Sequence, residues 1–242
     1  MYVDLDATLL GEGGSLLRDG DGRFSLLGAR ALEVIARVSA ELVLFSGRRR
    51  SMLHEDARIL GAGSYVFEAG AGYVLGDGRG GWDAPEWLAG ELRREAIVAS
   101  GAVDLLLERF PSLRLHQEQE QEGREVTTLL RGPVDPAAAD ALLAEHGHGA
   151  LRLLDNGAAL HLLPREVSKG RAVMAHRRAR GYAREDCLAI GDSREDLGAA
   201  EAVGAFWLVG NAGFPAPPGV HKAKESFGSG VYEAVITAAR TT

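Results

Sequence analysis

The sequence predicts an α/β fold in which a doubly wound parallel sheet carries an inserted α+β unit. Short apolar runs alternate with amphipathic helical patterns over residues 1–75 and again from residue 168 onward, as expected for a parallel sheet with helices on its faces. A glycine-rich stretch at residues 76–81 ends the first series and is typical of a hinge. Between the two series the patterns follow the order α-β-β-α-β-β, so we expect a separate small unit that covers the carboxyl edge of the sheet.

The composition limits the classes of partner. With 242 residues, 46% of them hydrophobic and 25% charged, the chain fits one large or two modest globular domains. A net charge of −7 argues against a surface for nucleic acids or anionic membranes, and we find neither a signal-like start nor an 18-residue apolar span. The single cysteine, Cys187, excludes an internal disulfide and a cysteine-based zinc site. We therefore expect a cytoplasmic monomer or homodimer with a small-molecule partner, no nucleic acid and no membrane.

The elements of the first series follow from hydrophobic periodicity. Ala31, Val34, Ile35 and Val38 recur at helical spacing, and residues 42–45 form a continuous apolar run that is typical of a strand buried on both faces. In chain order we expect a hairpin-like flap at 15–24, a helix at 28–39, a strand at 42–45, a helix capped by Ser51 and ending near 60, a strand at 65–68 and a short hairpin to 75.

The remaining patterns define the inserted unit and the second series. In the insertion we expect a helical region from 85 kinked near 100, strands at 113–119 and 125–131, a helix after 136, and a hairpin of strands 151–154 and 159–163 around an Asn-Gly turn. In the second series we expect a helix at 169–181, a strand at 187–190, a helix to 203, a strand at 206–209 and a last helix through 231–238. The predicted domains are therefore a core of residues 1–78 and 166–242 and a cap of residues 79–165.

Two carboxylates, one residue apart, follow the first apolar run. Side chains alternate along an extended backbone, so only one of Asp4 and Asp6 follows the strand direction, while the other turns with the loop. Such a pair suits two roles at one centre, at the carboxyl end of a strand where open α/β sheets bind their ligands. The alternative is a strand end with an Asx-type turn at Asp6.

Four further polar side chains stand at strand ends or helix starts. Ser46, Asp192 and Asp196 follow later strands, and Lys169 begins a helix. A cation at a helix N-terminus opposes the helix dipole, so Lys169 is expected to face an anion. Ser46 has the alternative of a turn residue, and Asp196 has the alternative of a capping box with Ser193.

Phosphoryl transfer would use all of these groups. The reaction needs a nucleophile, an in-line proton donor and positive charge for the non-bridging oxygens. A carboxylate nucleophile approaches a phosphate dianion only if charge is compensated, so a lysine and a hard cation held by carboxylates are required. Mg²⁺ suits an all-oxygen site, because it retains several waters and takes one or two carboxylates.

Four motifs together carry a family resemblance. They are Asp4-Leu5-Asp6-Ala7-Thr8-Leu9, Phe45-Ser46-Gly47-Arg48, Val167-Ser168-Lys169-Gly170 and Ile190-Gly191-Asp192-Ser193-Arg194-Glu195-Asp196. Over its whole length the chain resembles the haloacid dehalogenase superfamily of phosphohydrolases. The insertion resembles the class II, subtype B cap of Cof-type phosphatases, sucrose-phosphate phosphatase, trehalose-phosphate phosphatase and mannosyl-3-phosphoglycerate phosphatase. The resemblance implies a Rossmann-like core with a cap that sets substrate specificity.

The resemblance also implies catalytic roles. Asp4 would attack phosphorus and become an aspartyl-phosphate, and Asp6 would protonate the leaving sugar oxygen and then activate water. The Ser46 hydroxyl and the Lys169 ammonium would hold phosphoryl oxygens.

A metal site is implied as well. Mg²⁺ would be bound by the Asp4 carboxylate, the Asp6 backbone carbonyl and the Asp192 carboxylate, and Asp196 would orient the metal shell.

The motifs imply that three more residues lie beside the substrate. They differ from the usual family pattern at two positions. Thr8, Gly47 and Arg48 are expected beside the substrate, although Arg48 has the alternative of an ion pair with an acidic side chain. The family usually has glycine at the position of Ala7 and asparagine at the position of Glu195. Neither departure removes an acting group, so we expect activity.

Specificity is expected from polar side chains of the cap. Arg131, His161 and Arg165 lie in or just after predicted cap strands, which are expected to be half-covered. The basic run at residues 48–50 is expected to be a solvated face.

The leading hypothesis is a Mg²⁺-dependent phosphatase of a small phosphorylated carbohydrate, either a sugar phosphate or a glycosyl-phosphoglycerate. The alternatives are a phosphomutase on the same fold and a non-enzymatic protein that senses or binds phosphate. A phosphomutase would release isomerised sugar phosphate and no free phosphate. The inserted cap argues against a phosphate-sensing receiver. The presence of Asp4, Asp6, Lys169 and Asp192 gives no support to a binding protein that has lost catalysis.

Overall fold

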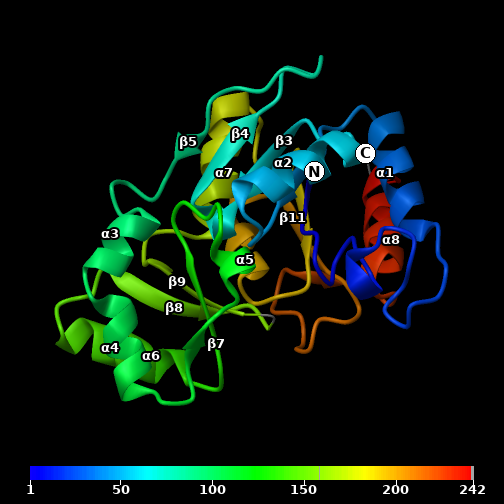
Figure 1. Ribbon diagram of the computed structural model, residues 1–242. Helices are drawn as coiled ribbons and strands as arrows, with labels where there is room; N and C mark the ends of the chain where they lie inside the picture. Colours follow the sequence, from blue (N-terminus) through cyan, green and yellow to red (C-terminus); the bar gives the residue numbers. More distant parts are fainter. Residues whose placement is uncertain (158, 241–242) are drawn as a thin grey trace.

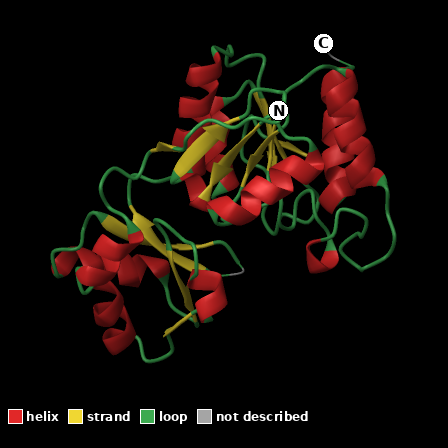
Figure 2. Cartoon of the chain, turned by 45° about the horizontal axis from the view of Figure 1, so that its top comes forward, coloured by secondary structure: helices red, strands yellow, loops and turns green. Residues whose placement is uncertain are grey.

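The computed structural model describes residues 1–157 and 159–240 and divides into a larger and a smaller lobe (Figure 1). An eight-stranded sheet forms the centre of the larger lobe, and a four-stranded sheet forms the centre of the smaller one. Figure 2 shows the two sheets apart, each with its own helices. The α/β class predicted from the sequence is thereby confirmed.

The large sheet is mostly parallel. Its strands run in the order β12-β11-β10-β1-β2-β3-β4-β5, and only the pairs β3–β4 and β4–β5 are antiparallel. The strands are β1 (Tyr2–Val3), β2 (Val43–Phe45), β3 (Ser64–Phe67), β4 (Gly72–Leu75), β5 (Glu86–Trp87), β10 (Leu188–Gly191), β11 (Ala205–Leu208) and β12 (His221–Lys222). The short β1 lies between β10 and β2 in parallel register, so the carboxyl ends of these three strands meet at one edge.

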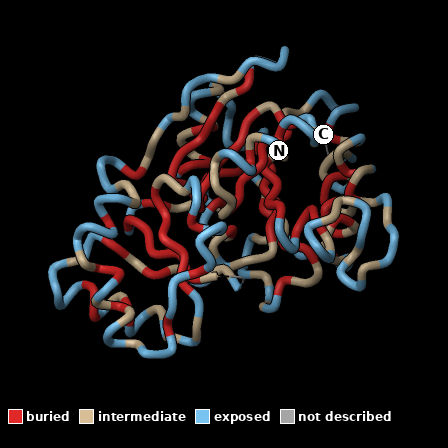
Figure 3. Tube along the Cα trace, viewed as in Figure 1, coloured by how far each residue is buried: buried red, intermediate tan, exposed pale blue. Residues whose placement is uncertain are grey.

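Helices cover both faces of this sheet. On one face Ile35 of α1 (Leu27–Arg37), Leu53 of α2 (Arg50–Leu60) and Val231 of α8 (Phe227–Ala239) join one apolar cluster. On the other face Val173 of α7 (Lys169–Arg180) and Ala199 of the 3₁₀ helix η3 (Asp196–Ala202) join a second. The tube in Figure 3 is accordingly buried along the central strands. Two further 3₁₀ turns are η1 (Glu12–Gly14) and η2 (Glu68–Gly70).

The smaller lobe is an antiparallel sheet with helices on one face. Its strand order is β6-β7-β9-β8, and its elements are α3 (Arg94–Ala99), α4 (Ala102–Arg109), β6 (Arg114–Leu115), α5 (Glu118–Gln121), β7 (Thr128–Arg131), α6 (Pro136–Glu145), β8 (Leu151–Asp155) and β9 (Leu160–Pro164). Leu130 and Leu162 pack with Leu106 and Leu142 of the helices. Alternation of side chains then turns the neighbouring strand residues to the opposite face.

Several predicted boundaries differ from the structure. The region expected to be helical from residue 85 begins instead with β5, which pairs with β4 of the large sheet, so the lobe boundary lies after the residue 79 that we expected. The strand expected at 113–119 ends at Leu115 and gives way to α5, because its Glu and Gln residues are good helix formers. The N-cap of α2 is Arg49, not Ser51. The helix expected before residue 203 is the 3₁₀ helix η3, and β12 was not predicted.

The basic run at residues 48–50 is not a solvated face, as we expected it to be. Arg49 donates to the carbonyls of Gln119 and Glu122 at 2.8 and 2.6 Å, and Arg50 Nε donates to Glu125 at 2.7 Å. These arginines extend from the start of α2 in the larger lobe to the α5 region of the smaller lobe. The run therefore helps to hold the two lobes together.

Glu68 makes a second connection between the lobes. Its fully buried carboxylate accepts hydrogen bonds from the backbone N–H groups of Glu125, Val126 and Thr127 at 2.8, 3.1 and 2.8 Å, and from the Thr127 hydroxyl at 3.0 Å. A carboxylate with this many donors has its desolvation compensated. The chain just before β7 is thereby fixed to the end of β3.

Among the helices of the described residues, none is both long and apolar enough to span a membrane.

A buried histidine lies beneath the sheet, away from the carboxylates of the strand ends. His176 of α7 is fully buried, its Nδ1 lies 2.9 Å from the Tyr2 hydroxyl, and the Tyr2 and Tyr73 rings pack edge-on against it. Burial lowers the pKa of His176 to about 4, although the charge of Glu41 opposes the shift. The imidazole is therefore neutral in the folded protein at neutral pH.

We predict that this histidine contributes to acid destabilisation. The unfolded chain takes up a proton near pH 6.5, whereas the folded chain resists protonation down to about pH 4, so stability falls as the pH drops through this window. His176→Gln should remove roughly 2–3 kcal/mol of that pH dependence. Urea unfolding at pH 7.5 and pH 4.5, with the exposed His146→Gln as control, measures it. An unchanged pH dependence in His176→Gln would contradict the assignment.

Candidate active site

The functional side chains come from three neighbouring strand ends and one helix start. Asp4 follows β1, Ser46 follows β2 and Asp192 follows β10, and the three strands are adjacent in the sheet. Lys169 is the first residue of α7, which begins after the smaller lobe. The topology therefore brings residues more than 160 positions apart to one place.

Lys169 is the centre of the constellation. Its ammonium donates to Asp4 Oδ1 at 2.7 Å and to Asp196 Oδ1 at 2.6 Å, and all three side chains are buried. Burial disfavours the ammonium, but the charges of Asp196 and Asp4 outweigh it and raise the pKa of Lys169. The anion expected opposite this helix start is therefore a pair of carboxylates, and the lysine stays charged at the site.

Asp196 combines the two roles that the sequence left open. Its Oδ2 accepts from the backbone N–H and the hydroxyl of Ser193 at 2.9 and 2.7 Å, and the Ser193 hydroxyl accepts from the Asp196 N–H at 3.2 Å. These are the reciprocal hydrogen bonds of a capping box. The same oxygen also accepts from the N–H of Asp192 at 3.0 Å, so Asp196 fixes the loop that carries Asp192 while it pairs with Lys169.

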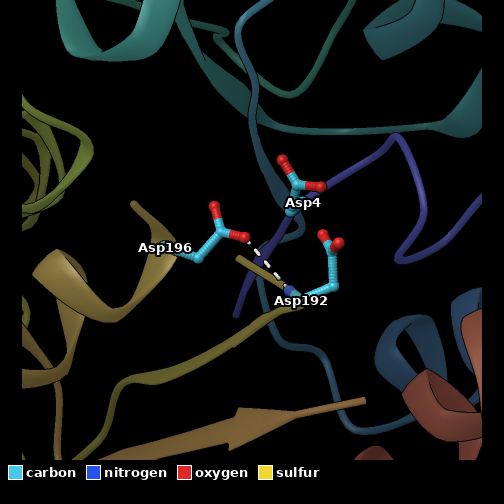
Figure 4. Close-up of side chains that lie close together, drawn as sticks. All are labelled: Asp4, Asp192 and Asp196. Carbon is cyan, nitrogen blue, oxygen red and sulfur yellow. Dashed lines mark hydrogen bonds between the residues drawn. The ribbon is translucent and has the colours of Figure 1, made fainter. Parts of the chain in front are cut away.

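Three carboxylates could hold a cation. Ligand oxygens of Asp4, Asp192 and Asp196 all lie within 4.8 Å of one another, and Figure 4 shows them converging from the ends of β1 and β10 and the start of η3. Burial and the charge of Asp196 raise the pKa of Asp192 to about 6, because each carboxylate repels the others. The donor set consists of oxygens alone, which suits Mg²⁺. Since both oxygens of Asp196 already accept hydrogen bonds, Asp4 and Asp192 are the better ligands.

Thr8 contributes a buried hydroxyl that contacts one of these carboxylates. It is fully buried, and its hydroxyl donates to Asp192 Oδ1 at 2.9 Å. The residue does not line the cavity of the site. The Thr8 hydroxyl therefore orients Asp192, and the arrangement gives no support to the substrate contact that we expected.

Asp6 pairs with an arginine, whereas Asp4 pairs with the lysine. Arg48 binds the exposed Asp6 carboxylate with two nitrogens, at 2.9 and 2.5 Å, and its third nitrogen donates to Asp56 of α2 at 2.9 Å. Burial opposes the guanidinium charge, but hydrogen bonding and charge from Asp6 and Asp56 raise the pKa of Arg48 further above its ordinary value. Of the two roles left open for Arg48, the structure shows the ion pair.

Ser46 and Gly47 form the floor of the site on the β2 side. The Ser46 hydroxyl accepts from the Arg48 N–H at 3.2 Å, which is the turn contact, and the same side chain lines the cavity. Arg124 of the smaller lobe donates to the Gly47 carbonyl at 3.0 Å. A Cβ at Gly47 would lie 3.2 Å from His161 of that lobe, so glycine permits a close approach.

Ala7 adopts the backbone conformation that the usual glycine allows easily. Its φ is +59°, in the left-handed region that costs energy for a residue with a Cβ. The Ala7 carbonyl accepts from the Asn211 side chain at 2.8 Å, and Asn211 also accepts from the Phe227 N–H. This bridge to α8 holds the turn that places Asp6.

A cavity of about 640 Å³ lies between the lobes and is lined by Asp4, Lys169 and Asp192. From the smaller lobe His161, Asn156 and Arg131 reach it, and Asn156 Nδ2 lies 3.0 Å from His161 Nε2. Burial lowers the pKa of His161 to about 3, aided by the charges of Arg124 and Lys169, so the imidazole is neutral and can accept or donate one hydrogen bond.

Arg165 lies elsewhere. Its guanidinium donates to the carbonyls of Gly149 and Leu151 at 3.1 Å and pairs with Asp140 at 3.2 Å, and it is not among the cavity residues. Its position just after β9 places it beside the start of β8, so the arrangement gives no support to a substrate contact.

Sequence reasoning missed Arg124 and Asn156, which line the cavity together with His116 and Glu120. His116 and Glu120 share one face of the alternating run at 113–120, whereas Asn156 carried only a turn signal. Nothing in the sequence around Arg124 distinguishes it from a surface arginine.

The profile of the sucrose-6F-phosphate phosphohydrolases matches residues 1–215. The chain belongs to this family. It is a phosphatase of the haloacid dehalogenase superfamily, as the four motifs predicted, and thus a phosphoric monoester hydrolase.

Relatives and solved structures agree with this membership. A phosphoglycolate phosphatase of Methanoculleus marisnigri is 27% identical over 239 residues, which cover 97% of this chain and 94% of that protein. The sucrose-phosphatase of Synechocystis, solved with sucrose and phosphate, superposes with a TM-score of 0.67 at 19% identity and covers 98% of this chain and 96% of its own. A phosphatase of the same superfamily from Bacteroides thetaiotaomicron gives 0.74 at 15% identity, with 98% and 94% coverage. At these identities the two structures support the fold alone.

We predict that Lys169 stabilises the fold as well as the site. Lys169→Met leaves Asp4 and Asp196 buried without their cation, and loss of one partner of a buried ion pair costs about 3–5 kcal/mol. Urea unfolding at pH 8 in the presence of EDTA should show that loss. Lys222→Met is the control, because this lysine donates only to the Ala212 and Phe214 carbonyls near the surface. A Lys169→Met protein as stable as wild type would contradict the interpretation.

Proposed function

We propose that this phosphatase is Mg²⁺-dependent, acts through an aspartyl-phosphate on Asp4 and hydrolyses a small phosphorylated carbohydrate. The observation that carries the proposal is the buried Asp4–Lys169–Asp196 group with Asp192 beside it, at the floor of the cavity between the lobes. Asp4 would be the nucleophile, because it is held by a cation and lies at a strand end where a phosphoryl group can approach.

The other residues would divide the remaining tasks. Lys169 and the Ser46 hydroxyl would bind phosphoryl oxygens. Asp6 would give a proton to the leaving oxygen and then take one from water, which requires that Arg48 release it from the bidentate pair or share it. Asp4 and Asp192 would hold Mg²⁺, together with the Asp6 carbonyl, and Asp196 would orient them. When bound, the metal supplies positive charge against the phosphate oxygens.

We also propose that the smaller lobe is a cap that recognises the leaving group. His161 and Asn156 line the cavity and are hydrogen-bonded to each other, and polar groups of this kind suit a sugar hydroxyl. The Synechocystis protein, whose structure contains sucrose and phosphate, supports a carbohydrate.

A second substrate class is favoured by one side chain. Arg131 on β7 is exposed, lines the cavity, and has neither an ion pair nor a hydrogen bond from its guanidinium among the described residues. A free guanidinium at that place suits a carboxylate, and several relatives are named phosphoglycolate phosphatases. A phosphorylated short hydroxy acid is therefore the second candidate.

We predict that Asp4→Asn lowers the release of phosphate from p-nitrophenyl phosphate at least about 1,000-fold, because an amide is not a nucleophile. The exposed Asp21→Asn is the matched control. Circular dichroism should show both variants folded. Wild-type activity should require Mg²⁺ and disappear in EDTA, and retained turnover in Asp4→Asn would overturn the proposed nucleophile.

We predict that Arg131 separates the two substrate classes. If the leaving group carries a carboxylate, Arg131→Met should raise KM about tenfold or more for phosphoglycolate, since a charge-assisted hydrogen bond is lost, and leave KM for sugar phosphates within about threefold. If the substrate is a sugar phosphate, a panel assay should show turnover of sugar phosphates well above that of phosphoglycolate. Product analysis tests the phosphomutase alternative, which yields isomerised ester without free phosphate.

A further inference from the structure

Glu195 introduces a charge that the phosphoryl site must accommodate. It lies between Arg194 and the capping-box residue Asp196 and lines the cavity with Asp4 and Lys169. Its Oε1 atom is buried and has no hydrogen-bond partner among the described residues. A buried carboxylate oxygen without a donor is costly, so a cation is expected to act on it.

Two cations are near enough for their charge to act on Glu195. They are Lys169 of the core and Arg152 of the cap. Lys169 is already held by Asp4 and Asp196 at 2.7 and 2.6 Å. Arg152 is thus the cation that remains available.

Arg152 is a cation that likewise has a buried polar atom without a hydrogen-bond partner in the part of the chain that the structure describes. It stands on β8, opposite Leu163 of β9, and one of its terminal nitrogens donates to the Val167 carbonyl at 2.8 Å, directly before the turn that leads to Lys169. Its Nε is buried and has no hydrogen-bond partner among the described residues. Burial lowers the pKa of Arg152, and the charges of Glu195 and Asp140 oppose that shift. Asp140 already forms an ion pair with Arg165.

The balance of charge shows what such a pair would do. With all four carboxylates ionised, Asp4, Asp192, Asp196 and Glu195 place four negative charges around the ammonium of Lys169, and burial raises the pKa of Glu195 to about 7. Asp6 is compensated separately by Arg48. A divalent cation leaves one negative charge in excess, and a phosphate dianion would meet it at short range. Arg124 and Arg131 also line the cavity, but Arg152 is the arginine whose charge acts on Glu195, and it does so from the other lobe.

We propose that Arg152 is the counter-charge of Glu195 and that, through Glu195, this cap residue allows the site to accept a phosphate dianion. The proposal rests on the proposed phosphoryl site. Arg152 is a positioning residue, because it is not among the residues that line the cavity and would act on phosphate only through the carboxylate. The negative charge of the core site is then balanced only when the cap is in place.

The test measures the binding of inorganic phosphate to the full chain by titration calorimetry in the presence of Mg²⁺. Arg152→Met should weaken binding about tenfold, which corresponds to one uncompensated charge nearby. Glu195→Gln in the Arg152→Met protein should restore the affinity to within about threefold of wild type, because the repelling charge is gone. Arg152→Lys should keep wild-type affinity, and the exposed Arg171→Met, which breaks only a surface pair with Glu166, is the control.

The outcomes separate the alternatives. If the double variant binds as weakly as Arg152→Met, Arg152 only anchors the Val167 carbonyl and the proposal is wrong. If Glu195→Gln alone weakens binding tenfold, Glu195 itself binds the ligands, and the proposal is wrong as well. Rescue in the double variant together with unchanged turnover in Asp4→Asn would uphold the pair and reject only the proposed nucleophile.

Discussion

The buried ammonium of Lys169 between Asp4 and Asp196 is the interaction on which the rest of the structure depends. None of these three groups could be buried alone, because an isolated charge in the interior costs several kcal/mol. Their pairing requires that β1, η3 and the start of α7 meet, although one residue comes from the beginning of the chain and the others from its last third. The capping box of Asp196 and the contact of Thr8 with Asp192 then fix the loop that completes the group.

The same interaction sets the electrostatic problem of the site. One lysine cannot balance the carboxylates collected at the strand ends, and burial strengthens their mutual repulsion. A divalent cation, bound as proposed, would relieve most of this repulsion and would add positive charge toward a phosphate. In the protein alone, hydrogen bonds from Thr8, Ser193 and the loop backbone offset part of the repulsion.

Much of this arrangement followed from the sequence. Hydrophobic periodicity predicted the parallel core and the inserted unit, and the positions of Asp4, Ser46 and Asp192 after buried runs predicted a common edge. What the sequence did not predict depends on contacts between distant segments. The strand β5 is only two residues long and gains its structure from pairing with β4, and Arg49 and Arg50 are surface-like until the α5 region lies against them. Periodicity in a sequence reports on residues that are close along the chain, whereas these partners are far apart in the sequence.

The connection between the lobes explains how a cap can belong to a core site. Glu68 lies at the end of β3 with a positive φ of +45°, a strained conformation that is maintained only where the surroundings enforce it. Its carboxylate accepts hydrogen bonds from the backbone N–H groups just before β7, so this inner strand of the small sheet is fixed relative to the core strands. His161 and Arg131 on that sheet are consequently held over the cavity by a contact to backbone rather than by their own side chains. Residues on β7 and β9 can therefore change without loss of the contact that holds the two lobes together.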